Sequence, residues 1–206
     1  MEMLSIYNKE REYLGVATRD EVHAKGLWHE TFHCWILTKI DGKDYLYFQL
    51  RSKEKQDYPE LLDITAAGHL MAQEKVEDGI REMEEEIGIN VAIDELTYLG
   101  IIPYEKELLG FIDREHAHVF LLERTIPFDH FTLQPEEVSG VFLVGLEDFL
   151  DLWANNEESI YIEGFVENST IVKKQVVSKE HFVPHSDQFY RRTMEAIMEK
   201  RGKMND

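Results

Sequence analysis

The chain has 206 residues and a formal net charge of −19, with 41 Asp and Glu against 22 Lys and Arg. This excess of negative charge opposes binding to nucleic acid phosphates and to anionic membranes, so we expect neither as a partner. A hydrophobic content of 43%, with 11% aromatic residues, allows a sizeable core and excludes a disordered chain. A small anionic substrate stays compatible with the charge if a divalent cation screens it.

The N-terminal stretch MEMLSIYNKEREYLG lacks the basic start and apolar core of a signal peptide. No stretch reaches the ~18 apolar residues that a membrane span requires. Cys34 is the single cysteine, which excludes an intramolecular disulfide framework and a cysteine-rich zinc site. Its place in the alternating run HCWILTKI predicts a buried strand position. We expect a protein of a reducing compartment, the cytoplasm.

Two early apolar runs predict a strand pair. Residues 32–40 and 44–50 have the composition of strands, and Asp41 and Gly42 between them suit a tight hairpin turn. A polar segment then leads to LLDITAAGH, residues 61–69, which predicts a short buried strand running into a glycine turn.

The second half of the chain predicts further strands and two helices. We expect strands around 97–103, 116–123 and 138–144, a helix at 146–156, a hairpin of 159–166 with 169–177, and a closing helix after Ser186. Ser186 is an acceptable N-cap, and Lys200 and Arg201 suit the C-terminal end of the helix dipole. Strands mixed with a few helices indicate an α/β sheet with helices packed against it.

Residues 76–87 predict an amphipathic helix, which Gly88 can end in a left-handed conformation. On a helical wheel one side gathers the apolar residues Val76, Ile80, Met83 and Ile87. The other side gathers the carboxylates of Asp78, Glu82, Glu85 and Glu86. Clustered like charges cost a few tenths of a kcal/mol per pair, a cost that Mg²⁺ or Mn²⁺ would offset. From these residues alone, a solvated acidic face is an equally good interpretation.

The stretch GHLMAQEKVEDGIREMEEEIGI, residues 68–89, closely resembles the signature of the Nudix hydrolases. The matching positions are Gly68, Glu74, Arg81, Glu82, Met83, Glu85, Glu86, Gly88 and Ile89. One departure is the spacer between Glu74 and Arg81, which has six residues where the family usually has seven. The acidic face follows this spacer, so the arrangement of its carboxylates should be unchanged. The sequence leaves two alternatives for Glu74, which either reaches the metal or does not.

The resemblance implies an α/β fold, the Nudix-type α/β/α sandwich with a mixed central sheet. We expect a single domain over residues 1–206, with its core at about 28–155 after an N-terminal lead-in and before a strand and helix extension at 156–206. The implied activity is divalent-metal-dependent hydrolysis of the pyrophosphate linkage in a nucleoside diphosphate derivative or a similar small organic diphosphate. Homodimers are common in the family, and the sequence leaves this point open.

The same resemblance implies Mg²⁺ or Mn²⁺ as the cofactor, held by Glu82, Glu85 and Glu86. Catalysis is expected to involve Glu82, Glu85 and Arg81, the arginine orienting one of the glutamates by an ion pair. The family often adds an acid from a late loop, for which Glu136 and Glu137 are candidates; a solvated turn is the alternative. The motif does not say which carboxylate acts as general base.

The region RDEVHAKGLWHETFHCWIL is similar to the corresponding part of isopentenyl diphosphate isomerases, in the same superfamily. In those enzymes histidines and a pair of later acids hold a metal, and the matching positions here are His23, His29, His69, Asp113 and Glu115. Such donors suit Mn²⁺ or Mg²⁺. A single histidine is more often a hydrogen-bonded structural residue than a metal ligand, and this is the role that we expect for His33, His116 and His118.

Ala67 stands where the isomerases carry a catalytic cysteine, so the proton-transfer group is missing. The isomerases also tend to have a degraded acidic motif, which is complete here. Both features favour hydrolysis over an isomerase-like enzyme, and the complete motif also favours it over a Nudix-fold nucleotide sensor without catalysis. Residues 51–61 and 104–115 and the C-terminal tail are expected to set substrate choice, and Trp28 and Trp35 are expected in the core.

Overall fold

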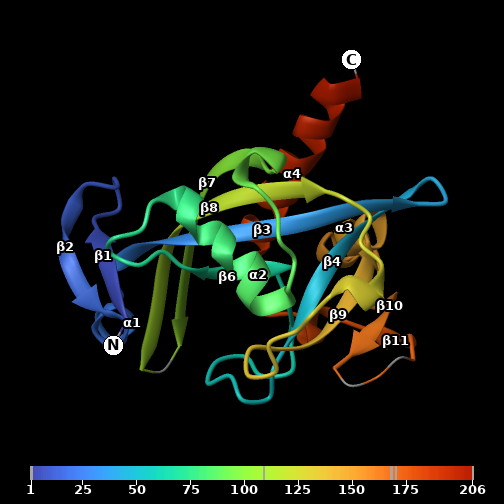
Figure 1. The fold of residues 1–206 in the computed structure, drawn as a ribbon, viewed down its shortest axis with the longest axis horizontal. Coiled ribbons are helices and arrows are strands. Elements are labelled where there is room, and N and C mark those ends of the chain that lie inside the picture. The colour runs from blue at the N-terminus through green and yellow to red at the C-terminus, as the bar shows by residue number, and fades with distance from the viewer. Residues whose placement is uncertain (1, 109, 168, 170, 206) are drawn as a thin grey trace.

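The protein, seen here in a computed structural model, is described over residues 2–108, 110–167, 169 and 171–205 (Figure 1). Within this part of the chain the strands form one eleven-stranded sheet, whose longest path runs β11-β10-β9-β4-β3-β1-β2. The strands are β1 (Met3–Tyr7), β2 (Tyr13–Thr18), β3 (Trp28–Ile40), β4 (Lys43–Arg51), β5 (Leu62–Asp63), β6 (Ala66–His69), β7 (Thr97–Leu108), β8 (Phe111–Glu123), β9 (Val138–Gly145), β10 (Ile160–Val166) and β11 (Lys173–Val177). The α-helices are α1 (Arg19–Lys25), α2 (Arg81–Ile87), α3 (Leu146–Trp153) and α4 (Asp187–Asn205).

The central strand β3 divides its side chains between two hydrophobic cores, as alternation along a strand requires. Trp35 and Leu37 pack in the core that α3 and α4 cover. Phe32, Cys34 and Ile36 pack in the core that α2 covers. Helices therefore cover both faces of a mixed sheet, in which β8 runs parallel to β3 and the other pairings are antiparallel (Figure 1). The expected α/β/α sandwich and the buried positions of Cys34 and Trp35 are confirmed.

The N-terminal lead-in folds as a β1–β2 hairpin followed by α1. Thr18 caps α1, and Gly26 ends it with a φ of 62°. Strand β3 then begins at Trp28, earlier than the expected residue 32, and pairs with β1 through His29 and Ile6. This hairpin pairs with the first residues of β3 and so keeps the start of that strand in the sheet.

The expected helix at 76–87 is α-helical only from Arg81 onward. Residues Val76–Ile80 form a 3₁₀ turn, η1, so the α-helical wheel does not apply to them. Asp78 therefore does not join the acidic face, and its carboxylate instead accepts a hydrogen bond of 2.8 Å from the Lys75 N–H. Gly88 ends α2 with a φ of 70°, as the sequence predicted.

The hairpin β7–β8 is longer than the expected strands and takes up most of 104–115, the segment that we expected to set substrate choice. Glu105 and Arg114 lie opposite each other on its strands and form an ion pair of 2.6 Å. Cross-strand charge pairs stabilise a polar hairpin that apolar alternation does not reveal. Asp113 and Glu115 consequently stand two residues apart on a strand, on one face of the sheet.

The C-terminal extension adds β10 and β11 to the sheet and closes with α4. Ser186 accepts a hydrogen bond of 3.2 Å from the Phe189 N–H, so the expected N-cap is confirmed. Before the helix, a bridge between Leu62 and Phe182 brings this late segment against β5. Among the described helices none combines the length and the apolar character needed to cross a membrane.

Candidate active site

A cavity of about 580 Å³ opens beside β6 and α2, within the size range of small-molecule sites. Its lining includes most of the residues that the sequence singled out: Glu82, Glu85, Glu86, Glu136, Glu137, His23, His69, Asp113, Glu115 and Gly68. Four others lie outside this lining: Glu74, Arg81, His29 and Gly88. The candidates from distant parts of the chain thus meet around one cavity.

Strand β6 joins the cavity to the acidic face of α2. The Ala67 N–H donates to Glu86 Oε2 at 3.0 Å, and Gln49 Nε2 donates to the same oxygen at 3.2 Å. Glu86 is only 6% exposed. Burial and the nearby Glu82 carboxylate raise the pKa of Glu86 to about 8. A cation beside Glu86 would therefore be needed to stabilise the ionised form of its carboxylate.

The contact between Gly68 and Glu82 explains why a glycine stands at this position of the motif. A Cβ atom at position 68 would overlap the Glu82 carboxylate, so glycine lets this carboxylate lie directly against β6. The expected glycine turn is wrong here, because residues 66–69 form a strand that pairs with β3. Burial, with a contribution from Glu85, raises the pKa of Glu82. The close packing therefore holds a second carboxylate at the cavity wall.

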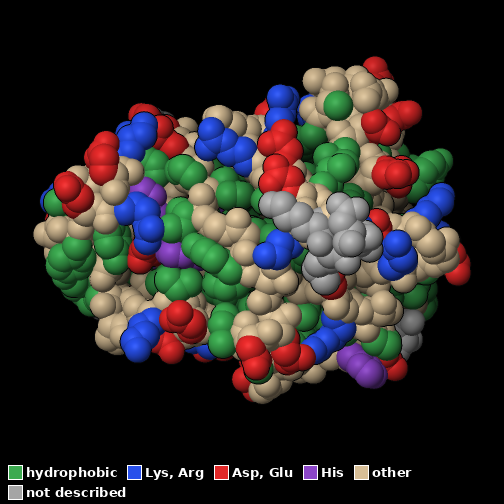
Figure 2. Space-filling view, turned by 90° about the horizontal axis from the view of Figure 1, so that it is seen from above, with side chains coloured by type: hydrophobic (Ala, Val, Ile, Leu, Met, Phe, Trp, Pro, Cys, Tyr) green, Lys and Arg blue, Asp and Glu red, His purple; other side chains and the backbone are tan. Residues whose placement is uncertain are grey.

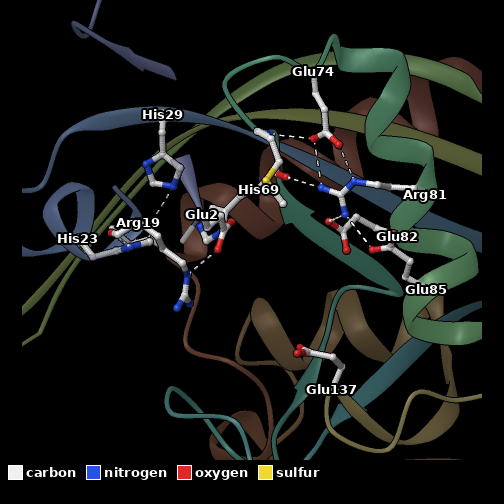
Figure 3. A network of polar contacts seen from close by, with 12 residues as sticks. Glu2, Arg19, His23, His29, His69, Glu74, Arg81, Glu82, Glu85 and Glu137 are labelled. Carbon is white, nitrogen blue, oxygen red and sulfur yellow. Dashed lines mark hydrogen bonds and ion pairs between the residues drawn. The ribbon is translucent and has the colours of Figure 1, made fainter. Parts of the chain in front are cut away.

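Arg81 ties the acidic residues together (Figure 3). Its guanidinium contacts Glu74 at 2.7 Å, Glu82 at 2.6 Å and Glu85 at 2.9 Å. It also donates to the His69 carbonyl at 3.1 Å, which links α2 to β6. The structure turns Glu74 toward Arg81 and not into the cavity, so its contacts make it an anchor of Arg81.

Three histidines from α1, β3 and β6 form a second group beside the first (Figure 3). One nitrogen of each of His23, His29 and His69 lies within 4.8 Å of the others. The Nδ1 atoms of His23 and His29 lie 2.9 and 3.1 Å from backbone carbonyl oxygens. A carbonyl only accepts, so each Nδ1 carries the proton and each Nε2 keeps a free lone pair. This is the arrangement of metal-binding histidines, whose other nitrogen is held by an oxygen.

Two carboxylates of β8 complete this histidine group. The parallel register of β3 and β8 places His29 opposite Glu115, and Asp113 Oδ1 lies 3.7 Å from Nε2 of both His23 and His29. Among the described residues, the buried atoms His29 Nε2 and Asp113 Oδ1 have no hydrogen-bond partner. Buried polar atoms rarely lack a hydrogen-bond partner, and a cation between these two atoms would give each of them one. His29, Asp113 and Glu115 together could hold such an ion.

The charges of this group also suit a cation. Burial lowers the pKa of His29 to about 3, so its imidazole is neutral, the form that binds metals. Burial and the neighbouring Glu115 raise the pKa of Asp113 well above its usual range. Against the effect of burial, a hydrogen bond with His33 holds the pKa of Glu115 below its usual range.

His33, which we expected to be a hydrogen-bonded structural residue, also lines the cavity, a position that we did not expect. Its Nε2 lies 3.2 Å from Glu115 Oε2, to which Thr31 also donates at 3.1 Å. The missed signal was period-two alternation, because His29, Thr31 and His33 share one face of β3.

His116 and His118 have the structural roles that were expected. They lie on the other face of β8, where His116 Nε2 is 3.0 Å from the Asn8 carbonyl oxygen and His118 Nε2 is 3.1 Å from Glu30 Oε1.

Further lining residues had no local signal in the sequence. Arg51 pairs with the buried Asp63 at 2.9 Å, and Asp63 also accepts from His185 Nε2 at 2.9 Å. Lys55 forms an ion pair with Glu137, which fixes the late acidic loop to the segment 51–61. Residues far apart in the chain make these contacts, so only the tertiary fold reveals them.

The NUDIX domain model matches residues 27–163 of the chain. An uncharacterized Nudix hydrolase of Clostridium acetobutylicum is 34% identical over 201 residues, covering 96% of this chain and 98% of that protein. An isopentenyl-diphosphate delta-isomerase of Aliivibrio fischeri is 32% identical over 143 residues, covering 68% of this chain and 78% of that protein.

The crystal structure of the Deinococcus radiodurans protein DR0079 shares the fold. It has a TM-score of 0.54 and 21% identity, and the match covers 76% of this chain and 91% of that one. The chain belongs to the NUDIX family and is a Nudix-type hydrolase related to the isopentenyl diphosphate isomerases.

Proposed function

We propose that this enzyme is a divalent-metal-dependent pyrophosphohydrolase acting on a small organic diphosphate, such as a nucleoside diphosphate derivative. The observation that carries the proposal is the convergence of Glu82, Glu85 and Glu86 on the wall of a cavity. The other donor group opens on the same cavity through His23, His69, Asp113 and Glu115, with His29 buried behind them. Two sets of oxygen and nitrogen donors suit Mg²⁺ or Mn²⁺.

Bound divalent cations would neutralise the diphosphate and lower the pKa of a water molecule. The chain's own residues prepare the site for this chemistry. Arg81 holds Glu82 and Glu85 in fixed positions through its ion pairs, so little reorganisation is needed when substrate binds. Arg19, Arg51 and Lys55 also line the cavity, and each is paired there with a carboxylate.

The surface of the protein supports a small-molecule partner. On the face in Figure 2, basic side chains stand among acidic ones. The protein as a whole has a net charge of −19, which repels a nucleic acid backbone, while a small diphosphate can enter a metal-loaded cavity.

An isomerase-like activity on prenyl diphosphates is the second candidate. The histidine and carboxylate group and the identity to an isopentenyl-diphosphate isomerase favour it. Ala67 opposes it, since a methyl group cannot carry a proton to or from a substrate carbon. We therefore rank hydrolysis first.

The test is a panel of nucleotide sugars, dinucleotides, and nucleoside di- and triphosphates, incubated with Mg²⁺ or Mn²⁺. We expect turnover of at least one compound and its loss in EDTA. Glu85→Gln should lower kcat about 10²-fold or more, because a metal ligand contributes several kcal/mol to the transition state. Glu84→Gln, an exposed neighbour on α2, is the matched control and should change kcat less than about 2-fold. Folded protein that hydrolyses none of the panel, or equal rates for both variants, would overturn the proposal.

A further inference from the structure

We propose that Glu2 is a positioning residue of the histidine group, holding His69 in the tautomer whose Nε2 lone pair is free for a metal. Glu2 Oε1 lies 3.0 Å from His69 Nδ1. A carboxylate accepts a hydrogen bond from Nδ1–H, which keeps the proton on Nδ1 and leaves Nε2 as the ligand atom. This inference rests on the cation at the histidine group that the proposed function contains.

His69 differs from the other two histidines in what holds its Nδ1. His23 and His29 are held by the carbonyl oxygens of Arg19 and Leu27, which no side-chain substitution removes. The Nδ1 of His69 is held by a side chain. The orientation of this one histidine therefore depends on the identity of residue 2.

The backbone around Glu2 is anchored from two sides, so its carboxylate has a defined place. The Arg19 N–H donates to the Glu2 carbonyl at 3.0 Å, and the Ala72 N–H donates to the Met3 carbonyl at 2.8 Å. Ala72 follows β6, which carries His69, and Arg19 begins α1, which carries His23. Strand β1 is thus fastened to the two elements that present these histidines.

Arg19 links the same residues a second time. Its Nε lies 3.6 Å from Glu2 Oε2, and its carbonyl oxygen holds His23 Nδ1 (Figure 3). Glu2, Arg19 and His23 all precede residue 27, where the family match begins. The N-terminal segment outside the matched NUDIX domain therefore takes part in shaping the site.

Loss of an oxygen that holds a metal-binding histidine typically costs 10- to 100-fold in metal affinity. The experiment compares the full chain with Glu2→Ala and Glu2→Gln. Two variants on the same hairpin serve as controls. Glu10→Ala removes an exposed carboxylate, and Ser5→Ala removes the hydroxyl that donates to Ala72 without touching His69.

Two measurements separate positioning from folding. Nitrogen-15 NMR of the metal-free proteins reports which nitrogen of His69 carries the proton. A Mn²⁺ titration followed by nitrogen modulation in pulsed EPR reports only the ions bound to histidine. For Glu2→Ala we expect loss of the Nδ1–H preference of His69 and a Kd for Mn²⁺ raised about 10- to 100-fold. Glu2→Gln, which keeps an acceptor oxygen, should fall between Glu2→Ala and wild type, and both controls should match wild type.

An unchanged tautomer and an unchanged Kd in Glu2→Ala would overturn the role of Glu2 while leaving the histidine group as a metal site. A Kd raised equally in Ser5→Ala would also overturn it, since the hairpin alone would then be responsible. A wild-type protein whose histidines show no Mn²⁺ would refute the histidine metal site itself, and this inference with it. Hydrolysis supported by the acidic residues could still stand, so the two failures are distinguishable.

Discussion

Gly68 of β6 lies against the carboxylate of Glu82 of α2, with no room for a methyl group between them. This contact joins the strand that carries His69 to the helix that carries the acidic residues. The two groups of metal donors therefore meet at this contact.

Gly68→Ala should displace the Glu82 carboxylate and lower kcat/KM about 10²-fold, because a metal ligand would move out of place. Gly202→Ala is the control, since a Cβ at that position meets nothing within 4 Å. Steady-state kinetics of both variants, with circular dichroism to check folding, measure the effect. Equal kcat/KM for Gly68→Ala and wild type would show that the contact has no catalytic importance.

Glu74→Gln tests the anchoring of Arg81. It weakens the ion pair of 2.7 Å and should lower kcat/KM about 10-fold, less than Glu82→Gln, because Glu74 acts only through Arg81. Glu77→Gln, exposed on the preceding 3₁₀ turn, should be silent. A loss in Glu74→Gln as large as in Glu82→Gln would instead point to Glu74 as a direct ligand.

The buried Glu86 should make stability depend on pH when no metal is bound. Burial raises its pKa from 4.5 to about 8, so between these values the native state keeps a proton that the unfolded state releases. The free energy of unfolding should therefore fall as pH rises from 5 to 8, by about 3.5 kcal/mol at most from this group. Glu86→Gln should remove this part of the slope.

Urea unfolding in EDTA at several pH values measures the two slopes. Because metal binding requires the ionised carboxylate, Mg²⁺ should restore stability more at pH 8 than at pH 6 in the wild type. Identical slopes for wild type and Glu86→Gln would contradict a raised pKa.

Proton exchange into isopentenyl diphosphate tests the second candidate function. With Ala67 in place of a proton carrier, we expect no deuterium in the substrate after incubation in D₂O with Mn²⁺. Mass spectrometry of the recovered compound gives the answer. If the wild type incorporated deuterium and Ala67→Ser incorporated the same amount, a residue other than residue 67 would carry the proton.

The acidic helix could be predicted because its signal is local. The spacing of Glu82, Glu85 and Glu86, with Gly88 after them, is set within one turn and a half of backbone. The preceding residues could not be assigned, since the same apolar pattern fits a 3₁₀ turn. Asp78 was misplaced for that reason.

The histidine group needed more than local pattern. The family resemblance supplied His23, His29 and His69. The structure adds why they converge: β6 pairs with β3, which places His69 opposite Thr31, and the N-terminal strand β1 pairs with β3 at His29. Glu2 and Arg51 were missed, because contacts with distant segments give them their place. Contacts of this kind leave no trace in the neighbouring sequence.

Anomalous diffraction from a crystal soaked in Mn²⁺ with a non-hydrolysable nucleoside diphosphate analogue tests the central claim most directly. We expect one anomalous peak among Glu82, Glu85 and Glu86, another among His23, His29 and His69, and diphosphate oxygens at the first. Clear density for the side chains with no peak at the acidic residues, or an analogue bound away from the cavity, would contradict the account.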